Sequence, residues 1–159
     1  MNKAQIVKQV ISSLNDSLEA VQKAARASHA EATHESSKAE NKYDTRGLEA
    51  AYLAGGQARQ AREILEAIKI YNAMSARNFA TEESVDLGAL VELQMDRTKS
   101  LYFIGPKSGG LEFMVATKEI TVITPQSPLG QNLMGKSAGH RWTIELGGST
   151  VSYRIVSVS

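Results

Sequence analysis

The first half of the chain carries two matched series of small and apolar residues, and their spacing constrains the fold more than any other feature. In each series the intervals alternate between four and three residues, which is the seam of a coiled coil. The first seam comprises Val7, Ile11, Leu14, Leu18, Val21, Ala25, Ser28 and Ala32. The second comprises Gly47, Ala51, Ala54, Ala58, Ala61, Leu65 and Ile68. Two matched seams predict two facing helices, that is, an antiparallel coiled-coil hairpin.

The polar stretch between the seams predicts the tip of the hairpin, at residues 34–44. Within it, Ser37 and Glu40 have the spacing of a capping box that opens the second helix. Chain reversal at this point sets large residues against each other at the open end, such as Ile11 against Leu65. Near the tip the facing residues are alanine, serine and glycine, so the two backbones can approach closely.

The composition changes after residue 77, where the dense alanine ends and all three prolines follow. We therefore expect a hairpin over residues 1–77, a linker over 78–85 and a globular domain over 86–159.

Short β-branched and aromatic runs in the last half predict an antiparallel sheet. We expect strands at residues 89–94, 99–104, 111–116 and 119–123, and a hairpin of 142–146 with 151–156 around Gly147-Gly148-Ser149. Between them, Pro128 fits the first position of a short helix and Gly135 fits the position just past its end. The predicted fold class is α+β, with the helical hairpin followed by an antiparallel β domain that has one short helix.

Bulk properties exclude several functional classes. The net charge is +1 and the basic residues are scattered, which disfavours binding to nucleic acid mainly through phosphate contacts. The absence of cysteine excludes disulfides and thiolate metal sites and fits a reducing cytosol. The start of the chain has no signal-type apolar run, and no stretch approaches the ~18 apolar residues of a membrane span. We expect a soluble cytoplasmic protein without membrane contact.

Two motifs could indicate chemistry, but their context argues against it. Residues 130–137 match the pattern of a P-loop letter for letter, yet a working P-loop opens a long helix, and here a strand is expected to follow. His29 and His34 are five residues apart, which does not place them on one helical face as zinc ligands, and His140 stands alone.

Carboxylates gather at the predicted tip, where Glu35, Glu40 and Asp44 lie within ten residues. Glu40 and Asp44 are four apart and therefore project from the same side of a helix. They could share a divalent cation that another macromolecule already holds in part. The plainer alternative is that they stabilise the start of a helix through its macrodipole.

The segment from Ile120 to Lys136, followed by a hairpin ending at residues 153–159, resembles the carboxy-terminal domain of the Gre transcript-cleavage factors, the GreA/GreB family. The residues in register with that family are Ser127, Pro128, Leu133, Gly135 and Lys136. The order of a coiled coil and then an FKBP-like domain also resembles the family, so the similarity covers nearly the whole chain.

The resemblance implies a bacterial accessory factor of RNA polymerase that acts as a monomer and is not itself an enzyme. The globular domain would dock beside the secondary channel through Ser127, Pro128, Leu129 and Lys136, and the coiled coil would reach toward the active site. Nucleic acid would be met only indirectly, within the elongation complex.

The resemblance also implies roles for residues at the tip. The candidate site residues are Glu35, Glu40, Asn41 and Asp44, with Glu40 and Asp44 as ligands of a Mg²⁺ ion shared with the polymerase rather than bound stably. They would help a backtracked complex cleave its own RNA.

The tip departs from the family pattern Asp-Leu-x-Glu-Asn. Matching Glu40-Asn41 to Glu-Asn places Ser37 at the first Asp, and a second placement, with Asn41 and Asp44 on the acidic positions, also loses that Asp. The alternative function is therefore a channel-binding regulator without cleavage activity.

An FKBP-like domain also raises prolyl isomerisation, which needs an aromatic-lined pocket. This half has five aromatic residues, most of which are expected to serve its core instead: Tyr102, Phe103, Phe113, Trp142 and Tyr153.

Overall fold

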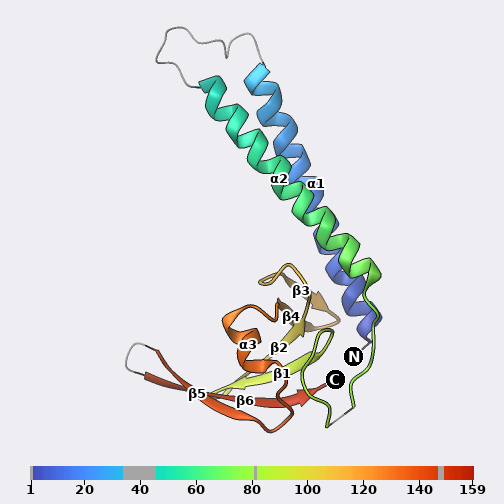
Figure 1. Cartoon of the computed structure of the whole chain (residues 1–159), viewed down its shortest axis with the longest axis vertical. Coiled ribbons are helices and arrows are strands. Elements are labelled where there is room, and N and C mark those ends of the chain that lie inside the picture. The colour runs from blue at the N-terminus through green and yellow to red at the C-terminus, as the bar shows by residue number, and fades with distance from the viewer. Residues whose placement is uncertain (1, 34–45, 81, 147–148) are drawn as a thin grey trace. The chain divides into compact units, whose positions relative to one another are not determined.

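The structure is a computed structural model that describes residues 2–33, 46–80, 82–146 and 149–159. Residues 12–69 form one compact unit, and residues 1–11 together with 70–159 form another. The first contains most of two long helices, and the second contains the sheet and a short helix (Figure 1).

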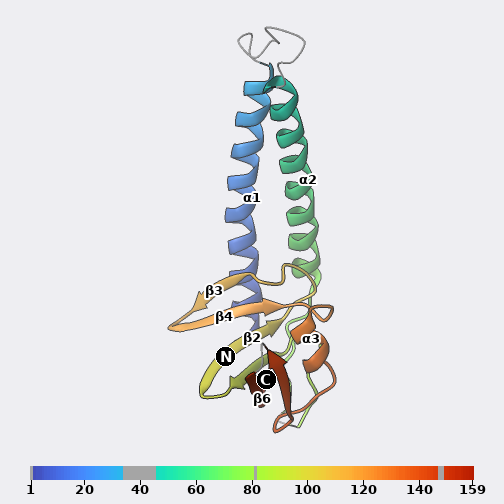
Figure 2. The same cartoon turned by 90° about the vertical axis from the view of Figure 1, so that its left-hand side faces the viewer.

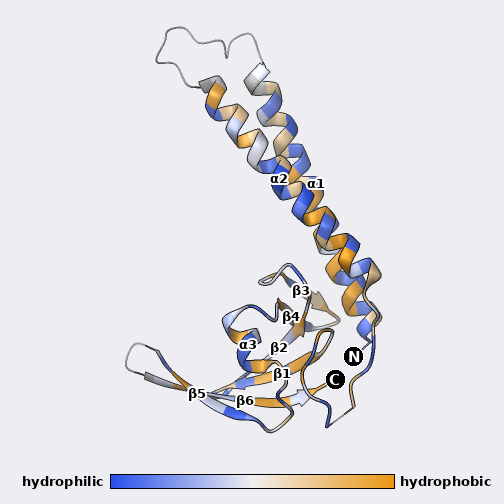
Figure 3. Cartoon of the chain, viewed as in Figure 1, coloured by the Kyte–Doolittle hydropathy of each residue, from blue (hydrophilic) through white to orange (hydrophobic). Residues whose placement is uncertain are grey.

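The predicted helical hairpin is present. Helix α1 spans Lys3–Thr33 and helix α2 spans Arg46–Ala73. Within the hairpin unit the two helices lie side by side in both views (Figures 1 and 2), and apolar and polar residues alternate along them (Figure 3). The first seam is confirmed from Leu14 to Ser28, because these two residues are 4% and 7% exposed and the seam positions between them are half-buried.

The second seam was partly wrong, since three of its positions are displaced by one residue. Leu65 is 48% exposed, whereas Ile64 beside it is half-buried, and Ala50 rather than Ala51 is buried. The inward series is Gly47, Ala50, Ala54, Gln57, Ala61, Ile64 and Ile68. This inward series is difficult to recognise in the sequence because Gln57 is polar. The predicted seam has Ala58 at that place and therefore contains only small or apolar residues.

The predicted tip lies outside the described residues, and so does the Ser37–Glu40 capping box. Among the residues that the structure describes, no helix has an apolar stretch long enough to cross a membrane.

In the part of the chain that the structure describes, six strands form one mixed sheet in the order β3-β4-β2-β1-β6-β5. They are β1 (Leu90–Met95), β2 (Thr98–Ile104), β3 (Glu112–Val115), β4 (Lys118–Ile123), β5 (Arg141–Leu146) and β6 (Ser149–Val158). The predicted fold class is confirmed, except that β2 and β4 pair in parallel rather than antiparallel. The reason is the path of the chain through β3, which lies outside β4 and runs antiparallel to it. The chain reverses direction between β2 and β3 and again between β3 and β4, so β4 runs in the same direction as β2.

One face of the sheet is covered by α3 (Pro128–Leu133) and by the segment before β1. Leu133 is fully buried there, and Phe79 and Val85 join it. The strand residues of this core alternate along the sheet and are Val91, Leu93, Ile104, Ile123, Ile155 and Val158.

The opposite face is apolar along β2, β4 and β3 and at Leu90 of β1, and it is polar along the rest of β1 and along β6 and β5. Phe103 and Val122 are paired and buried on its apolar part. Tyr71, near the end of α2, and Val122 both lie close to Gly105. A Cβ built on Gly105 would be 2.1 Å from the Tyr71 hydroxyl oxygen and 2.8 Å from Cγ1 of Val122. The hydroxyl donates to the carbonyl of Lys107 at 2.8 Å, and burial raises the pKa of Tyr71.

The first turn of α1 is anchored by a buried lysine. Lys3 is 3% exposed, and its Nζ donates to the carbonyl oxygens of Gly88, at 3.0 Å, and of Ser159. The ring of Phe79 lies 5.0 Å from Nζ, which adds a cation–π contact. Burial, and secondarily the charge of Arg77, lowers the pKa of Lys3 to about 8.

Candidate functional site

The predicted docking segment, residues 127–136, is built around a helix cap. Ser127 is the N-cap of α3, and its Oγ accepts a hydrogen bond from the Gly130 N–H at 3.0 Å. The same hydroxyl donates to the carbonyl of Thr124 at 2.8 Å. Pro128 occupies the start of the helix, where its missing N–H leaves no donor unpaired. The cap thus fixes the direction in which the chain leaves β4.

Two glycines are required by the backbone of this segment. A Cβ on Gly130 would lie 2.0 Å from the Thr124 carbonyl oxygen, so α3 packs against this carbonyl only without a side chain at this position. Gly135 has a φ of +72°, a left-handed conformation that favours glycine and ends the turn after α3.

The far end of the segment is held by the chain before β1. The Val85 N–H donates to the Lys136 carbonyl at 2.7 Å, and the Gly135 N–H donates to the Val85 carbonyl at 2.9 Å. Next to this pair, the hydroxyls of Ser84 and Ser137 are 3.2 Å apart. The segment is therefore fixed at both ends by hydrogen bonds.

The four predicted docking residues differ in accessibility. Pro128 and Lys136 are exposed, whereas Ser127 and Leu129 are half-buried and Leu129 packs against the core. Pro128 and Lys136 are accessible for direct contact with a partner. The Ser127 hydroxyl already donates one hydrogen bond and accepts another within the cap.

A charged pair lies in the chain that precedes the Ser84–Val85 contacts. Arg77 forms a hydrogen bond and an ion pair with Glu83, and its guanidinium lies 3.7 Å from the centre of the Phe79 ring. The Glu83 carboxylate also accepts from the Ala80 N–H at 3.0 Å. The hydrogen bond from Arg77, followed by that from Ala80, lowers the pKa of Glu83.

The P-loop pattern at residues 130–137 does not form a phosphate cradle. Its backbone N–H groups at Gly130, Gln131, Met134, Gly135 and Lys136 all donate to atoms of the protein. A phosphate-binding loop needs such groups free and a long helix after them. Here α3 has six residues, and the next element is β5.

The tip residues Glu35, Glu40, Asn41 and Asp44 lie outside the described residues, so their predicted roles stay predictions. Across the part of the chain that is described, no three His, Asp or Glu side chains come together as a metal site. In the hairpin unit, small residues of both helices line a shallow groove, among them Ala25, Ala51 and Ala58.

Two of the five aromatic residues of the β domain, Trp142 and Tyr153, line the same hollow, and the other three do not. Phe103 and Phe113 are buried, and Tyr102 packs against the core. Trp142 stacks on Tyr153 with 5.1 Å between ring centres. This arrangement serves packing, as the sequence predicted.

Sequence reasoning missed two features, the contacts of Ser84 and Val85 with the docking segment and a pair of neighbouring arginines, Arg141 and Arg154. The arginine pair had a usable signal. A hairpin turn expected at Gly147-Gly148 from the sequence would pair residue 141 with residue 154, and these two residues are paired in the structure. The first feature had none, because residues 84 and 137 are far apart in sequence.

Comparison with known proteins places this arrangement in a family. The family described as "Transcription elongation factor, GreA/GreB, C-term" matches residues 80–159, which is half of the chain. Among proteins with curated descriptions, none matches significantly.

Several solved structures match this chain. Gfh1 of Thermus aquaticus is 22% identical, with 95% of this chain and 92% of that chain covered and a TM-score of 0.37. GreA factor homolog 1 (Gfh1) of Thermus thermophilus is 17% identical, covers 94% of both chains and has a TM-score of 0.37. The GreA/GreB elongation factor from Nitrosomonas europaea is 15% identical over 70% of this chain and 92% of that chain, also with a TM-score of 0.37. On the strength of the family match over residues 80–159, the chain belongs to the GreA/GreB family of transcription elongation factors.

Proposed function

We propose that this chain binds bacterial RNA polymerase, inserts its helical hairpin into the secondary channel and modulates elongation. The observation that carries the proposal is the family match over residues 80–159, the part that contains the whole sheet and α3. In this role the protein would act in the cytoplasm, as a monomer, and would meet nucleic acid only through the elongation complex.

The docking surface we propose is the segment from Ser127 to Lys136. Pro128 and Lys136 are exposed on a segment that hydrogen bonds hold at both ends, so little conformational entropy is lost on binding. Lys136 supplies a positive charge for an acidic partner group. Pro128 supplies a rigid apolar contact, and Leu129 supports it from the core side.

The hairpin has the dimensions of a probe for a narrow channel. Helix α1 has 31 residues, which corresponds to a length of about 46 Å. We propose that the residues between the helices, with Glu40 and Asp44 as the leading candidates, present carboxylates to a Mg²⁺ ion shared with the polymerase. Glu35 and Asn41 would assist them. Carboxylate oxygens are the hard donors that Mg²⁺ prefers, and a second metal ion stabilises the attacking and leaving oxygens of phosphodiester hydrolysis.

A second candidate function is regulation of the channel without cleavage. The observation that favours it is Ser37, a serine at the position of an expected aspartate. With one carboxylate fewer, the tip would occupy the channel but hold the metal weakly.

The test is a transcript-cleavage assay with a stalled, backtracked elongation complex, combined with a binding measurement on the polymerase. We expect binding by the wild type, at least tenfold weaker binding by Lys136→Glu, and unchanged binding by the control Lys118→Glu, which alters an exposed lysine at the start of β4. An absence of binding and of any effect on pausing, initiation or cleavage would refute the proposal.

The two candidate functions separate at the tip. If the tip supports cleavage, Glu40→Ala and Asp44→Ala reduce RNA shortening while binding is retained. If the chain only regulates, the wild type gives no shortening and Ser37→Asp creates it. Strong cleavage by the unaltered protein would exclude the second candidate.

A further inference from the structure

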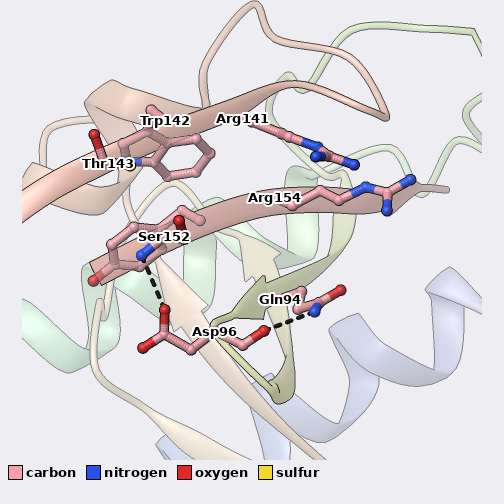
Figure 4. A pocket seen from close by; sticks show the side chains of 8 residues that line it. Gln94, Asp96, Arg141, Trp142, Thr143, Ser152 and Arg154 are labelled. Atoms are coloured by element: carbon pink, nitrogen blue, oxygen red, sulfur yellow. Dashed lines mark hydrogen bonds between the residues drawn. The ribbon is translucent and has the colours of Figure 1, made fainter. Parts of the chain in front are cut away.

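Three neighbouring strands place Gln94, Arg154 and Arg141 in one row across the polar face of the sheet. Gln94 of β1 pairs with Arg154 of β6, and Arg154 pairs with Arg141 of β5. Directly paired residues point to the same face, and adjacent strands are about 4.8 Å apart. Figure 4 shows the two arginine side chains extending in the same direction. Two guanidinium groups can therefore reach one anionic group.

The two arginines are not compensated within the described part of the protein. Neither has a hydrogen bond or ion pair with a described residue, and like charges paired directly across strands are destabilising. The acids of this region have other partners. Glu92 forms an ion pair with Lys99 at 3.3 Å, and Asp96 accepts a hydrogen bond from the Ser152 N–H at 3.0 Å.

The row borders a hollow of about 530 Å³ (Figure 4). Its lining also includes the hydroxyl residues Thr143 and Ser152, which pair with each other in the next row of the same face. The Gln94 amide is held in place, because its Nε2 donates to the Asp96 carbonyl at 2.7 Å. Fixed polar groups beside two free guanidinium groups are the features of a binding site for an oxyanion.

We propose that this hollow binds an extended acidic segment of a partner protein, with one Asp or Glu side chain held by Arg141 and Arg154. Strand β5 is at the edge of the sheet, where an extended peptide can add as a further strand. A nucleic-acid backbone is the poorer fit, because the row offers two positive charges rather than a basic stripe. The site is separate from the Ser127–Lys136 segment and does not depend on polymerase binding.

The test uses the full chain and three fluorescent probes of matched length. The first probe is a peptide in which glutamate alternates with threonine, the second is its twin with glutamine for glutamate, and the third is a single-stranded RNA. Binding is measured by anisotropy for the wild type, Arg141→Gln, Arg154→Gln and the control Arg97→Gln, which alters an exposed arginine in the turn between β1 and β2. Nitrogen-15 NMR of the wild type locates the bound probe.

We expect the acidic peptide to bind the wild type at least tenfold more tightly than its glutamine twin. Each variant of the arginine pair should weaken binding about tenfold, since each removes a charge-assisted hydrogen bond, and Arg97→Gln should leave it unchanged. The largest NMR shifts should fall on residues 94, 141, 143 and 154. An absence of saturable binding to the acidic peptide, equal affinity in the arginine variants, or tighter binding of the RNA would overturn the proposal.

Discussion

Replacing Gly130 by alanine should destabilise the β domain by about 3 kcal/mol. The added Cβ would lie 2.0 Å from the Thr124 carbonyl oxygen, and Cβ atoms in real structures essentially never come within 3.0 Å of another atom, so α3 or this carbonyl must move by about 1 Å. That carbonyl accepts from the Ser127 N–H and hydroxyl, and the Ser127 hydroxyl accepts from the Gly130 N–H. Losing these three hydrogen bonds, at about 1 kcal/mol each, gives the stated value, which is at the upper end of ordinary overpacking costs.

The assay is urea unfolding followed by fluorescence of Trp142, the single tryptophan, which is stacked on Tyr153 in the β domain. With a slope of about 2 kcal/mol per molar urea, the midpoint should fall by about 1.5 M. Gly135→Ala is the matched control, because a Cβ there has no atom within 4 Å and only the positive φ opposes it. Its cost should be about 1 kcal/mol. If Gly130→Ala costs no more than Gly135→Ala, the packing of α3 against the Thr124 carbonyl does not restrict this position.

Two further predictions concern the anchor and the seam. The pKa of Lys3 is lowered to about 8 from 10.5, so between these pH values the unfolded chain binds more protons than the folded chain. The free energy of unfolding should therefore rise by up to about 2 kcal/mol as the pH is raised from about 8 to 9.5. The control Lys3→Met should remove this rise, and an equal rise in the variant would contradict the assignment. In α2, Ile64→Ala should lower the free energy of unfolding by about 1–2 kcal/mol, as measured by helical circular dichroism in urea. Leu65→Ala removes a side chain that is 48% exposed and should lower it by under about 1 kcal/mol. The reverse order would support the seam predicted from the sequence.

The fold was predictable where spacing alone decides the structure. The seam of α1 was read correctly from Leu14 to Ser28, whereas at the start of the helix Ile6 and Val10, one residue before the seam positions Val7 and Ile11, are fully buried. The seam of α2 was not read correctly, because Gln57 lies on the inward side and the alanines offer two equivalent series. In the sheet, alternation identified the strands, but it carries no information on direction. The parallel pairing of β2 with β4 follows only from the path of the chain through β3.

The docking segment shows why a motif can indicate a fold more firmly than a function. In the segment that resembles the family, Ser127 caps a helix, Pro128 starts it, Leu133 fills the core and Gly135 ends the turn. Each of these roles is local, and each would be needed whatever the domain bound. The overlapping residues 130–137 satisfy the P-loop pattern, yet the backbone N–H groups that a phosphate would need are already used. Binding specificity must therefore come from the few side chains that the backbone leaves exposed, and charge variants of Lys136 test the function more directly than variants of the motif's glycines.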